Sequence, residues 1–199
     1  MIGSLPRYQQ LPLDYRYALD GAMVPLHKAE RILVRLPSTP WEEEVTQRLP
    51  QAQKQGSADA GLWIEPGTRT WEHNLQDFRS GLSENGLLVV IASRPLARIL
   101  PQKSWENHPP LGIQITGMRR LRQGLVQADF CIESCYGVHT LAAILWNQAG
   151  QWMGRCCRPD LEDRWQFAAR LRYHTLGRWA FLSTVALIFA YKRGEGCGK

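Results

Sequence analysis

The chain has 199 residues, of which 44% are hydrophobic and 21% are charged, and its formal net charge is +6. This length provides a core for one domain and is short for two, so we predict a single domain over residues 1–199, with an N-terminal cover segment over 1–28. The composition excludes a fibrous or mainly disordered chain. The basic balance suits nucleic acid, an anionic membrane surface or an acidic partner, and it also suits an ordinary solvated surface.

The sequence predicts neither a transmembrane segment nor a signal peptide. The longest apolar stretch, residues 179–191, has thirteen residues, whereas a membrane span needs roughly twenty. Residues 1–10 lack the apolar core that a signal peptide requires. We therefore expect a cytoplasmic protein whose five cysteines are free thiols.

The first part of the chain predicts a helix, a strand and a second helix. Apolar residues spaced three to four apart predict a short helix over 13–23. Residues 30–36 form the first predicted strand, and the segment LPSTP at 36–40 should turn from it into a helix. Thr39 is a suitable N-cap, and Pro40 suits a first helical turn, where its missing N–H would be unpaired anyway.

Residues 58–92 form a predicted β-α-β unit. A strand over 60–64 is followed by a helix whose apolar residues recur at helical spacing, and Asn85-Gly86 should turn into an aliphatic run over 87–92. Such a run is typical of a parallel strand that is covered on both faces. A right-handed crossover between the two strands is therefore expected.

The remainder of the chain alternates between helix and strand and ends on a strand. The predicted elements are a helix over 116–127, a strand over 130–136, a helix over 161–176 and a last strand over 180–191. Residues 137–147 fit a helix or an extended loop. Four residues should form the buried side of the 116–127 helix: Met118, Leu121, Leu125 and Val126. The alternation indicates an α/β fold with a mostly parallel sheet and an antiparallel C-terminal strand.

The cysteines argue against a metal site. Cys131 and Cys135 lie four residues apart on a predicted strand, so their side chains should point to the same face. A metal there would need two more soft ligands, for which Cys156-Cys157 is the only source. Because vicinal cysteines chelate poorly through both sulfurs and the chain contains no CxxC pair, we predict that no metal is bound.

Three segments carry a family resemblance. They are ADAGLWIEPG with WEHNLQDFRSGLSENGLLVVIAS between residues 58 and 93, GMRRLRQGLVQADFCIESCYGVH at 117–139 and STVALIFAYKR at 183–193. They resemble the fourth to seventh strands, with their helices, of class I S-adenosylmethionine-dependent methyltransferases. The resemblance implies a Rossmann-like, methyltransferase-type sheet. It also implies a shortened sheet, because residues 37–58 have room for one helix and a loop and not for strands two and three.

The resemblance implies S-adenosylmethionine as cofactor, but the segment that should hold it departs from the family. A glycine-rich loop follows strand one in the family, because backbone N–H groups must approach the cofactor closely. Here that position holds LPSTP, in which two prolines remove two N–H donors. The family also ends strand two with an acidic residue that holds the ribose hydroxyls, and a missing strand two leaves no place for it. The segment thus occupies the position of the cofactor loop without its physical properties.

Seven residues are the candidate contacts with a cofactor or a substrate. The cofactor contacts would be Leu36, Ser38, Thr39, Glu65 and Gly67. Glu65 should lie at the carboxyl end of a central strand, where open α/β sheets keep their sites, and the alternative is a solvated carboxylate at a strand end. His139 and Tyr136, near the end of the next predicted strand but one, are the candidate substrate contacts. No catalytic residue is assigned.

The sequence leaves more than one function open. The first is methyl transfer from S-adenosylmethionine to an acceptor. The second is a non-catalytic, methyltransferase-like subunit for binding or assembly, which the missing glycine loop and the eight tryptophans favour. A third is a basic module for nucleic acid or anionic membrane surfaces. A shortened sheet should leave strand 30–36 as an exposed edge, where we expect a homo-oligomer contact or a protein partner.

Overall fold

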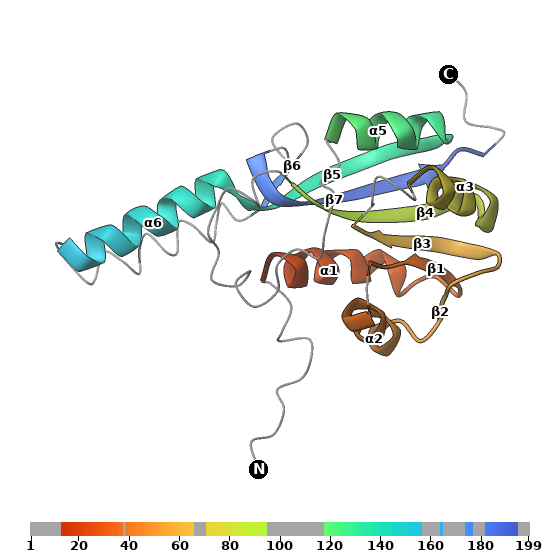
Figure 1. Cartoon of the computed structure of the whole chain (residues 1–199), viewed down its shortest axis with the longest axis horizontal. Coiled ribbons are helices and arrows are strands. Elements are labelled where there is room, and N and C mark those ends of the chain that lie inside the picture. Colours follow the sequence, from red (N-terminus) through yellow and green to blue (C-terminus); the bar gives the residue numbers. More distant parts are fainter. Residues whose placement is uncertain are drawn as a thin grey trace, which may run out of the picture.

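A seven-stranded sheet in the order β2-β1-β3-β4-β7-β5-β6 forms the centre of the molecule (Figure 1). The computed structural model describes residues 13–37, 39–65, 71–94, 118–156, 164, 174–176 and 182–194. The strands are β1 (Ile32–Arg35), β2 (Ala52–Gln53), β3 (Ala58–Ile64), β4 (Leu82–Ser93), β5 (Phe130–Thr140), β6 (His174–Leu176) and β7 (Ser183–Lys192). The helices are α1 (Leu13–Leu26), α2 (Thr39–Arg48), α3 (Trp71–Gly81), α5 (Met118–Gln127) and α6 (Leu141–Cys156).

The sheet is parallel at one side and mixed at the other. β2, β1, β3 and β4 run parallel to one another. β7 runs antiparallel between β4 and β5, and β6 pairs antiparallel with β5. The apolar stretch near the C-terminus therefore becomes a central strand, in which six successive residues from Ser183 to Ile188 are buried. This arrangement confirms the predicted α/β sheet with an antiparallel C-terminal strand.

Helices cover both faces of the sheet, and alternate residues of β4 point into the two cores. Val89 and Ile91 belong to the core under α1 and α2, whereas Leu88 and Val90 belong to the core under α3 and α5. Figure 1 shows α5 and α3 on one side of the sheet and α1 and α2 on the other. Because both faces are buried, the strand reads as a continuous aliphatic run rather than an alternating one.

A short strand two is present, contrary to the sequence prediction. Ala52 and Gln53 form β2, which pairs parallel with Ile32 and Leu33 of β1. A two-residue strand leaves no periodic pattern, so only its pairing reveals it. In the described part of the chain no further strand lies beyond β2. The sheet is thus shortened at this side as predicted. The prediction that strand 30–36 is an exposed edge was wrong, because β1 lies between β2 and β3.

A bulge in β5 overturns the prediction that Cys131 and Cys135 share a face. Cys131 pairs with Tyr191 and Cys135 with Ile188, so five residues of β5 (131–135) oppose four residues of β7 (188–191). The extra residue lies between Ile132 and Ser134, and one inserted residue reverses the faces of all later side chains. Cys131 is exposed and Cys135 is half-buried as a result.

Other predicted boundaries also shift. β4 begins at Leu82 instead of after a turn at Asn85-Gly86, and the strand kinks at Asn85, whose φ is 61°. A Cβ on Gly86 would lie 2.8 Å from the Ser83 carbonyl oxygen, so the kink requires glycine there. Residues 137–147, which sequence left undecided, contain the end of β5 and the start of α6.

Two features of the predicted helices were wrong. Residues 174–176, which were predicted to end a helix, form strand β6, because their backbone pairs with β5. The preceding residues of that prediction lie outside the described part of the chain, apart from Arg164. On α5, Leu121 and Leu125 are buried as expected, but Val126 is 49% exposed. The side chain of Met118 is not among those described.

Candidate functional site

Polar residues gather where the parallel strands end. β3 leads into Glu65, β4 ends at Ser93 and Arg94 follows it. Because β7 is antiparallel, its first residues, Ser183 and Thr184, lie at the same edge, as the pairing of Ser93 with Val185 shows. Open α/β sheets bind ligands at this carboxyl edge, so it is the candidate site.

Glu65 joins three elements at this edge. Its Oε1 atom accepts hydrogen bonds from the backbone N–H of Ser93 at 2.9 Å and from the Ser93 hydroxyl at 2.6 Å. The Tyr15 hydroxyl of α1 donates to the same oxygen and also contacts the Ser93 hydroxyl. All three residues are buried. The carboxyl group therefore ties α1 to the ends of β3 and β4.

Burial dominates the ionisation of this carboxyl group. Removal from water raises the pKa of Glu65 to about 7, although hydrogen bonds from Ser93 and Tyr15 act in the opposite direction. The backbone at Glu65 has a φ of 54°, in the left-handed region, and its N–H donates to the Ile91 carbonyl oxygen at 2.7 Å. The sequence prediction placed Glu65 correctly at a strand end. The residue is buried and hydrogen-bonded, however, and not a solvated carboxylate.

The turn after β1 is short and leads directly into α2. Leu36 packs against the core under α1 and α2, and Pro37 is exposed. Ser38 lies outside the described residues, and α2 begins at Thr39. Arg35, at the end of β1, donates to the Asp77 carboxylate at 2.7 Å and to the Val34 and Lys54 carbonyl oxygens.

These residues do not fit an adenosyl group held in the manner of the family. The described turn contains no glycine, and Pro37 and Pro40 have no N–H to offer. β2 ends at Gln53 and is followed by Lys54, so the acidic residue that the resemblance requires for the ribose is not there. Lys54 instead pairs with Glu42, 3.1 Å away. Gly67, the remaining predicted cofactor contact, lies outside the described residues.

The two predicted substrate contacts lie apart along β5. His139 is half-buried at the end of the strand and has a φ of 56°. Next to it, the Thr140 hydroxyl accepts the Ala143 N–H at 3.1 Å and caps α6. Tyr136 packs edge-on against Phe189, with the ring centres 5.7 Å apart. Of the pair, only His139 therefore lies at the carboxyl edge.

Arg94 is a residue of this edge to which the sequence alone gave no role. Its backbone N–H donates to the Thr184 carbonyl oxygen at 2.8 Å, which fixes the residue next to β7. Its side chain is buried, with 6% exposed, and Nε and Nη1 have no hydrogen-bond partner. Burial lowers the pKa of Arg94, and the nearby Cys135 opposes that shift. The only signal in the sequence was an arginine directly after an aliphatic strand.

A separate cavity of about 520 Å³ opens beside β1. It lies between α3 and the residues after β2, and its polar lining includes Arg35, Ser57, His73 and Asp77. His73 is largely exposed, with Nε2 3.7 Å from the Asp77 carboxylate. Because Asp77 already pairs with Arg35, the charges of this cavity largely satisfy one another.

The described residues contain neither a metal cluster nor a membrane-spanning helix. No group of three or more His, Cys, Asp or Glu side chains within these residues could hold a metal ion. Among the helices that the structure describes, none combines the length and the apolar character needed to cross a membrane.

Comparison with known proteins identifies the fold. A SAM-dependent methyltransferase and possible histamine N-methyltransferase from Thermotoga maritima superimposes with a TM-score of 0.55 at 12% identity, covering 94% of this chain and 92% of that one. The cyclopropane synthase MmaA2 from Mycobacterium tuberculosis gives a TM-score of 0.42 at 12% identity, covering 89% of this chain and 84% of that one. No family model and no curated protein matches the sequence. The chain thus has a class I S-adenosylmethionine-dependent methyltransferase-like fold, as the Thermotoga structure shows.

Proposed function

We propose that this chain is a methyltransferase-like binding or assembly subunit that does not transfer a methyl group from S-adenosylmethionine. The observation that carries the proposal is the turn from β1 to α2, where two prolines stand in place of glycine and β2 provides no carboxylate. Close contact with a nucleotide needs free backbone N–H groups. Fold alone does not determine function, so the chemistry of this turn weighs more than the fold likeness.

The hydrogen bonds of Glu65 also support a non-catalytic role. A general base must reach the proton that it removes in a bound substrate. Here Oε1 already accepts from Ser93 and Tyr15, and all three side chains are buried. The strand-end carboxyl group therefore acts as a structural link between α1 and the sheet.

Isothermal titration calorimetry with S-adenosylmethionine and S-adenosylhomocysteine tests the proposal. We expect no saturable heat up to about 1 mM, the upper end of the usual range of enzyme–substrate affinities. An active methyltransferase titrated in the same buffer is the positive control. Saturable binding in the micromolar range, together with transfer of a radiolabelled methyl group to any acceptor, would overturn the proposal.

The second candidate is an S-adenosylmethionine-dependent methyltransferase, and the polar carboxyl edge favours it. In that case Leu36, Ser38, Thr39, Glu65 and Gly67 would contact the cofactor. His139 and Tyr136 would contact the acceptor. The same titration separates the two candidates, because methyl transfer requires the cofactor to bind.

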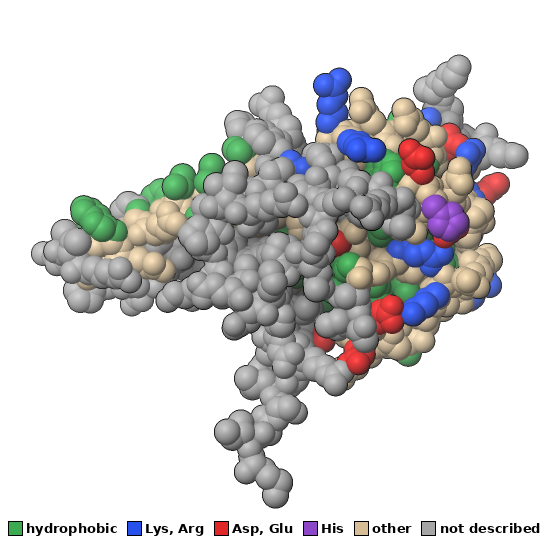
Figure 2. Space-filling model, viewed as in Figure 1, with side chains coloured by type: hydrophobic (Ala, Val, Ile, Leu, Met, Phe, Trp, Pro, Cys, Tyr) green, Lys and Arg blue, Asp and Glu red, His purple; other side chains and the backbone are tan. Residues whose placement is uncertain are grey.

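For the assembly role we propose a second copy of the chain as partner and α6 as the contact surface. Leu145 and Trp152 are 55% and 63% exposed. They lie seven residues apart, so they share one side of the helix. Figure 2 shows hydrophobic side chains along α6, which extends beyond the sheet in Figure 1. The edge strand β2, with two residues, offers little backbone for pairing. The competing proposal is that the basic surface binds nucleic acid or anionic membranes. In either case we expect the protein in the cytoplasm.

A further inference from the structure

The guanidinium group of Arg94 is a buried cation without a counterion among the described residues. Its side chain is 6% exposed, and neither Nε nor Nη1 donates a hydrogen bond. Burying a charge without a partner is strongly unfavourable. A ligand that supplies the missing acceptor atoms would satisfy these N–H donors and offset the cost of burying the charge.

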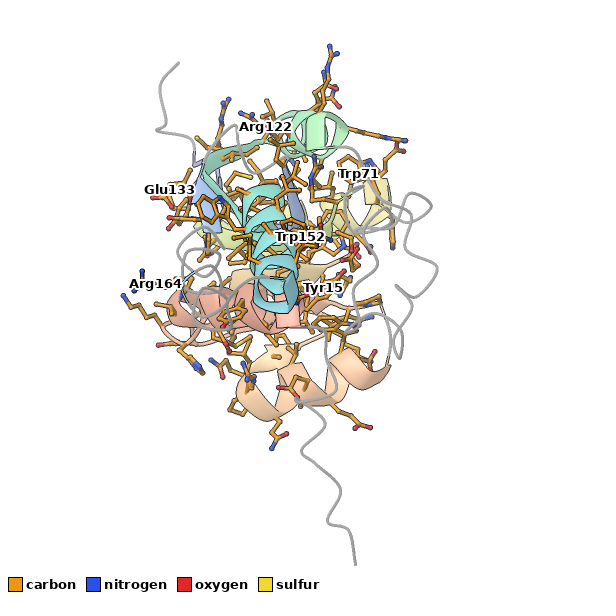
Figure 3. All side chains as sticks on the ribbon, turned by 90° about the vertical axis from the view of Figure 1, so that its left-hand side faces the viewer. Tyr15, Trp71, Arg122, Glu133, Trp152 and Arg164 are labelled. Atoms are coloured by element: carbon orange, nitrogen blue, oxygen red, sulfur yellow. The ribbon has the colours of Figure 1, made fainter. Side chains whose placement is uncertain are left out.

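The alternation of side chains along β4 shows on which face of the sheet Arg94 lies. Ser93 points toward Tyr15 under α1, and successive residues of a strand point to opposite faces. Arg94 therefore lies on the face that α3 and α5 cover. Figure 3 shows Trp71 and Arg122 on that side and Tyr15 on the other.

Small residues form the floor of the sheet next to Arg94. Ala92 pairs with Ala186, and Ala186 pairs with Gly137 across the sheet. This row of three small residues spans β4, β7 and β5 directly behind the edge. Alanine and glycine have little side-chain volume, so none of these three residues projects a bulky group beside Arg94.

The described charges near Arg94 attract anions. Cys135 lies close enough for the guanidinium to influence it, but burial raises the pKa of this thiol, so it is neutral at pH 7 and is not a counterion. Arg122 of α5 is also close to Cys135 and adds a second positive charge on the same side. No carboxylate in the part of the chain that the structure describes acts on the charge of Arg94.

We propose that Arg94 is the receptor for an oxyanion, a carboxylate or phosphate group of a small ligand, at the carboxyl edge of β4 and β7. The anion accepts hydrogen bonds from the N–H groups of the guanidinium, whose planar arrangement matches carboxylate and phosphate oxygens. This site goes beyond the function proposed above. It depends neither on the turn after β1 nor on Glu65, which lies on a neighbouring strand and bonds on the opposite face.

Thermal unfolding of the full chain in rising concentrations of sodium phosphate or sodium acetate tests the proposal, with sodium chloride at equal ionic strength as reference. We expect a saturable rise in Tm in at least one of the two anions. Arg94→Met should weaken the binding of that anion by about tenfold or more, because a hydrogen-bonded charge is lost. Arg119→Met, an exposed arginine of α5 with the same change in charge, should bind as the wild type does.

The two anions identify the ligand chemistry. A shift in phosphate alone indicates a phosphate group, and a shift in acetate, with or without phosphate, indicates a carboxylate. Absence of any shift beyond that of chloride, or an equal shift in Arg94→Met, overturns the proposal. If Arg94→Met does not fold, the 15N resonance of the wild-type Arg94 Nε decides: it must move saturably with the anion, and an unchanged resonance contradicts the site. None of these results requires S-adenosylmethionine, so they stand apart from the calorimetric test.

Discussion

Single residues at the carboxyl edge show how burial controls charge in this protein. Glu65 and Arg94 end neighbouring strands, and both are buried. The Glu65 carboxyl group is hydrogen-bonded within the chain, by Tyr15 and Ser93. Nε and Nη1 of Arg94 have no such partner among the described residues. The first is therefore a structural group, and the second is open to a ligand.

The ionisation of Glu65 predicts how stability depends on pH. Its pKa is raised from 4.5 to about 7 in the folded protein, so the folded state holds a proton that the unfolded state releases. This group contributes stability fully below pH 4.5, and the contribution is lost as pH rises to about 7. The loss is on the order of 3 kcal/mol, because each tenfold change in an acid dissociation constant corresponds to about 1.4 kcal/mol.

Urea unfolding of Glu65→Gln between pH 4.5 and 8 checks this prediction. The amide oxygen still accepts from Ser93 and Tyr15, so the variant should fold and should lack that part of the pH dependence. Glu72→Gln, at an exposed position of α3, is the control and should retain it. Equal pH profiles for wild type and Glu65→Gln would show that the carboxyl group is not perturbed.

Gly124 predicts a second effect at the scale of one residue. It is buried on α5, and a Cβ at this position would lie 2.0 Å from the Trp71 ring of α3. Alanine favours a helix more than glycine does, but here its methyl group must displace the Trp71 ring. Gly124→Ala should therefore lower the free energy of unfolding by about 1–3 kcal/mol. Gln123→Ala, on the exposed side of the same helix, should have little effect in the same denaturation experiment. A neutral or stabilising Gly124→Ala would refute the close packing of α3 and α5.

At the scale of elements, the sequence predicted those helices and strands whose apolar spacing is visible locally. The β-α-β unit over 58–92 and the helix of α5 were predicted because their apolar spacing reflects their own burial. The face of Cys135 was not, because the bulge in β5 depends on pairing with β7. Strand β2 was missed for the same reason, since two residues carry no period. At the candidate site, the position of Glu65 followed from the sequence, whereas its bond to Tyr15, fifty residues away, did not.

The exposed side of α6 predicts self-association. Size-exclusion chromatography with light scattering should show a dimer for the wild type and a monomer for Leu145→Gln/Trp152→Gln, because the apolar contact area is lost. Val24→Gln replaces a valine that is 70% exposed on α1 and should remain dimeric. A monomeric wild type at about 100 μM, a concentration at which specific protein contacts are populated, would exclude α6 as a contact between copies.

At the scale of the whole molecule, the chain keeps the methyltransferase-like sheet but shortens it at the side where the cofactor's adenosyl group would be held. β1 continues into a turn with two prolines, and β2 has two residues. On the other side of the sheet, β7 pairs with both β4 and β5 and is largely buried. The short, proline-containing turn at one side and the paired strands at the other agree with the binding or assembly role proposed above.

A crystal of the full chain soaked with saturating S-adenosylhomocysteine tests the central claim most directly. The two prolines should keep the ligand away, so we expect no ligand density against Leu36 to Pro40. An adenosyl group seated on that turn, with its ribose at the end of β2, would contradict the account.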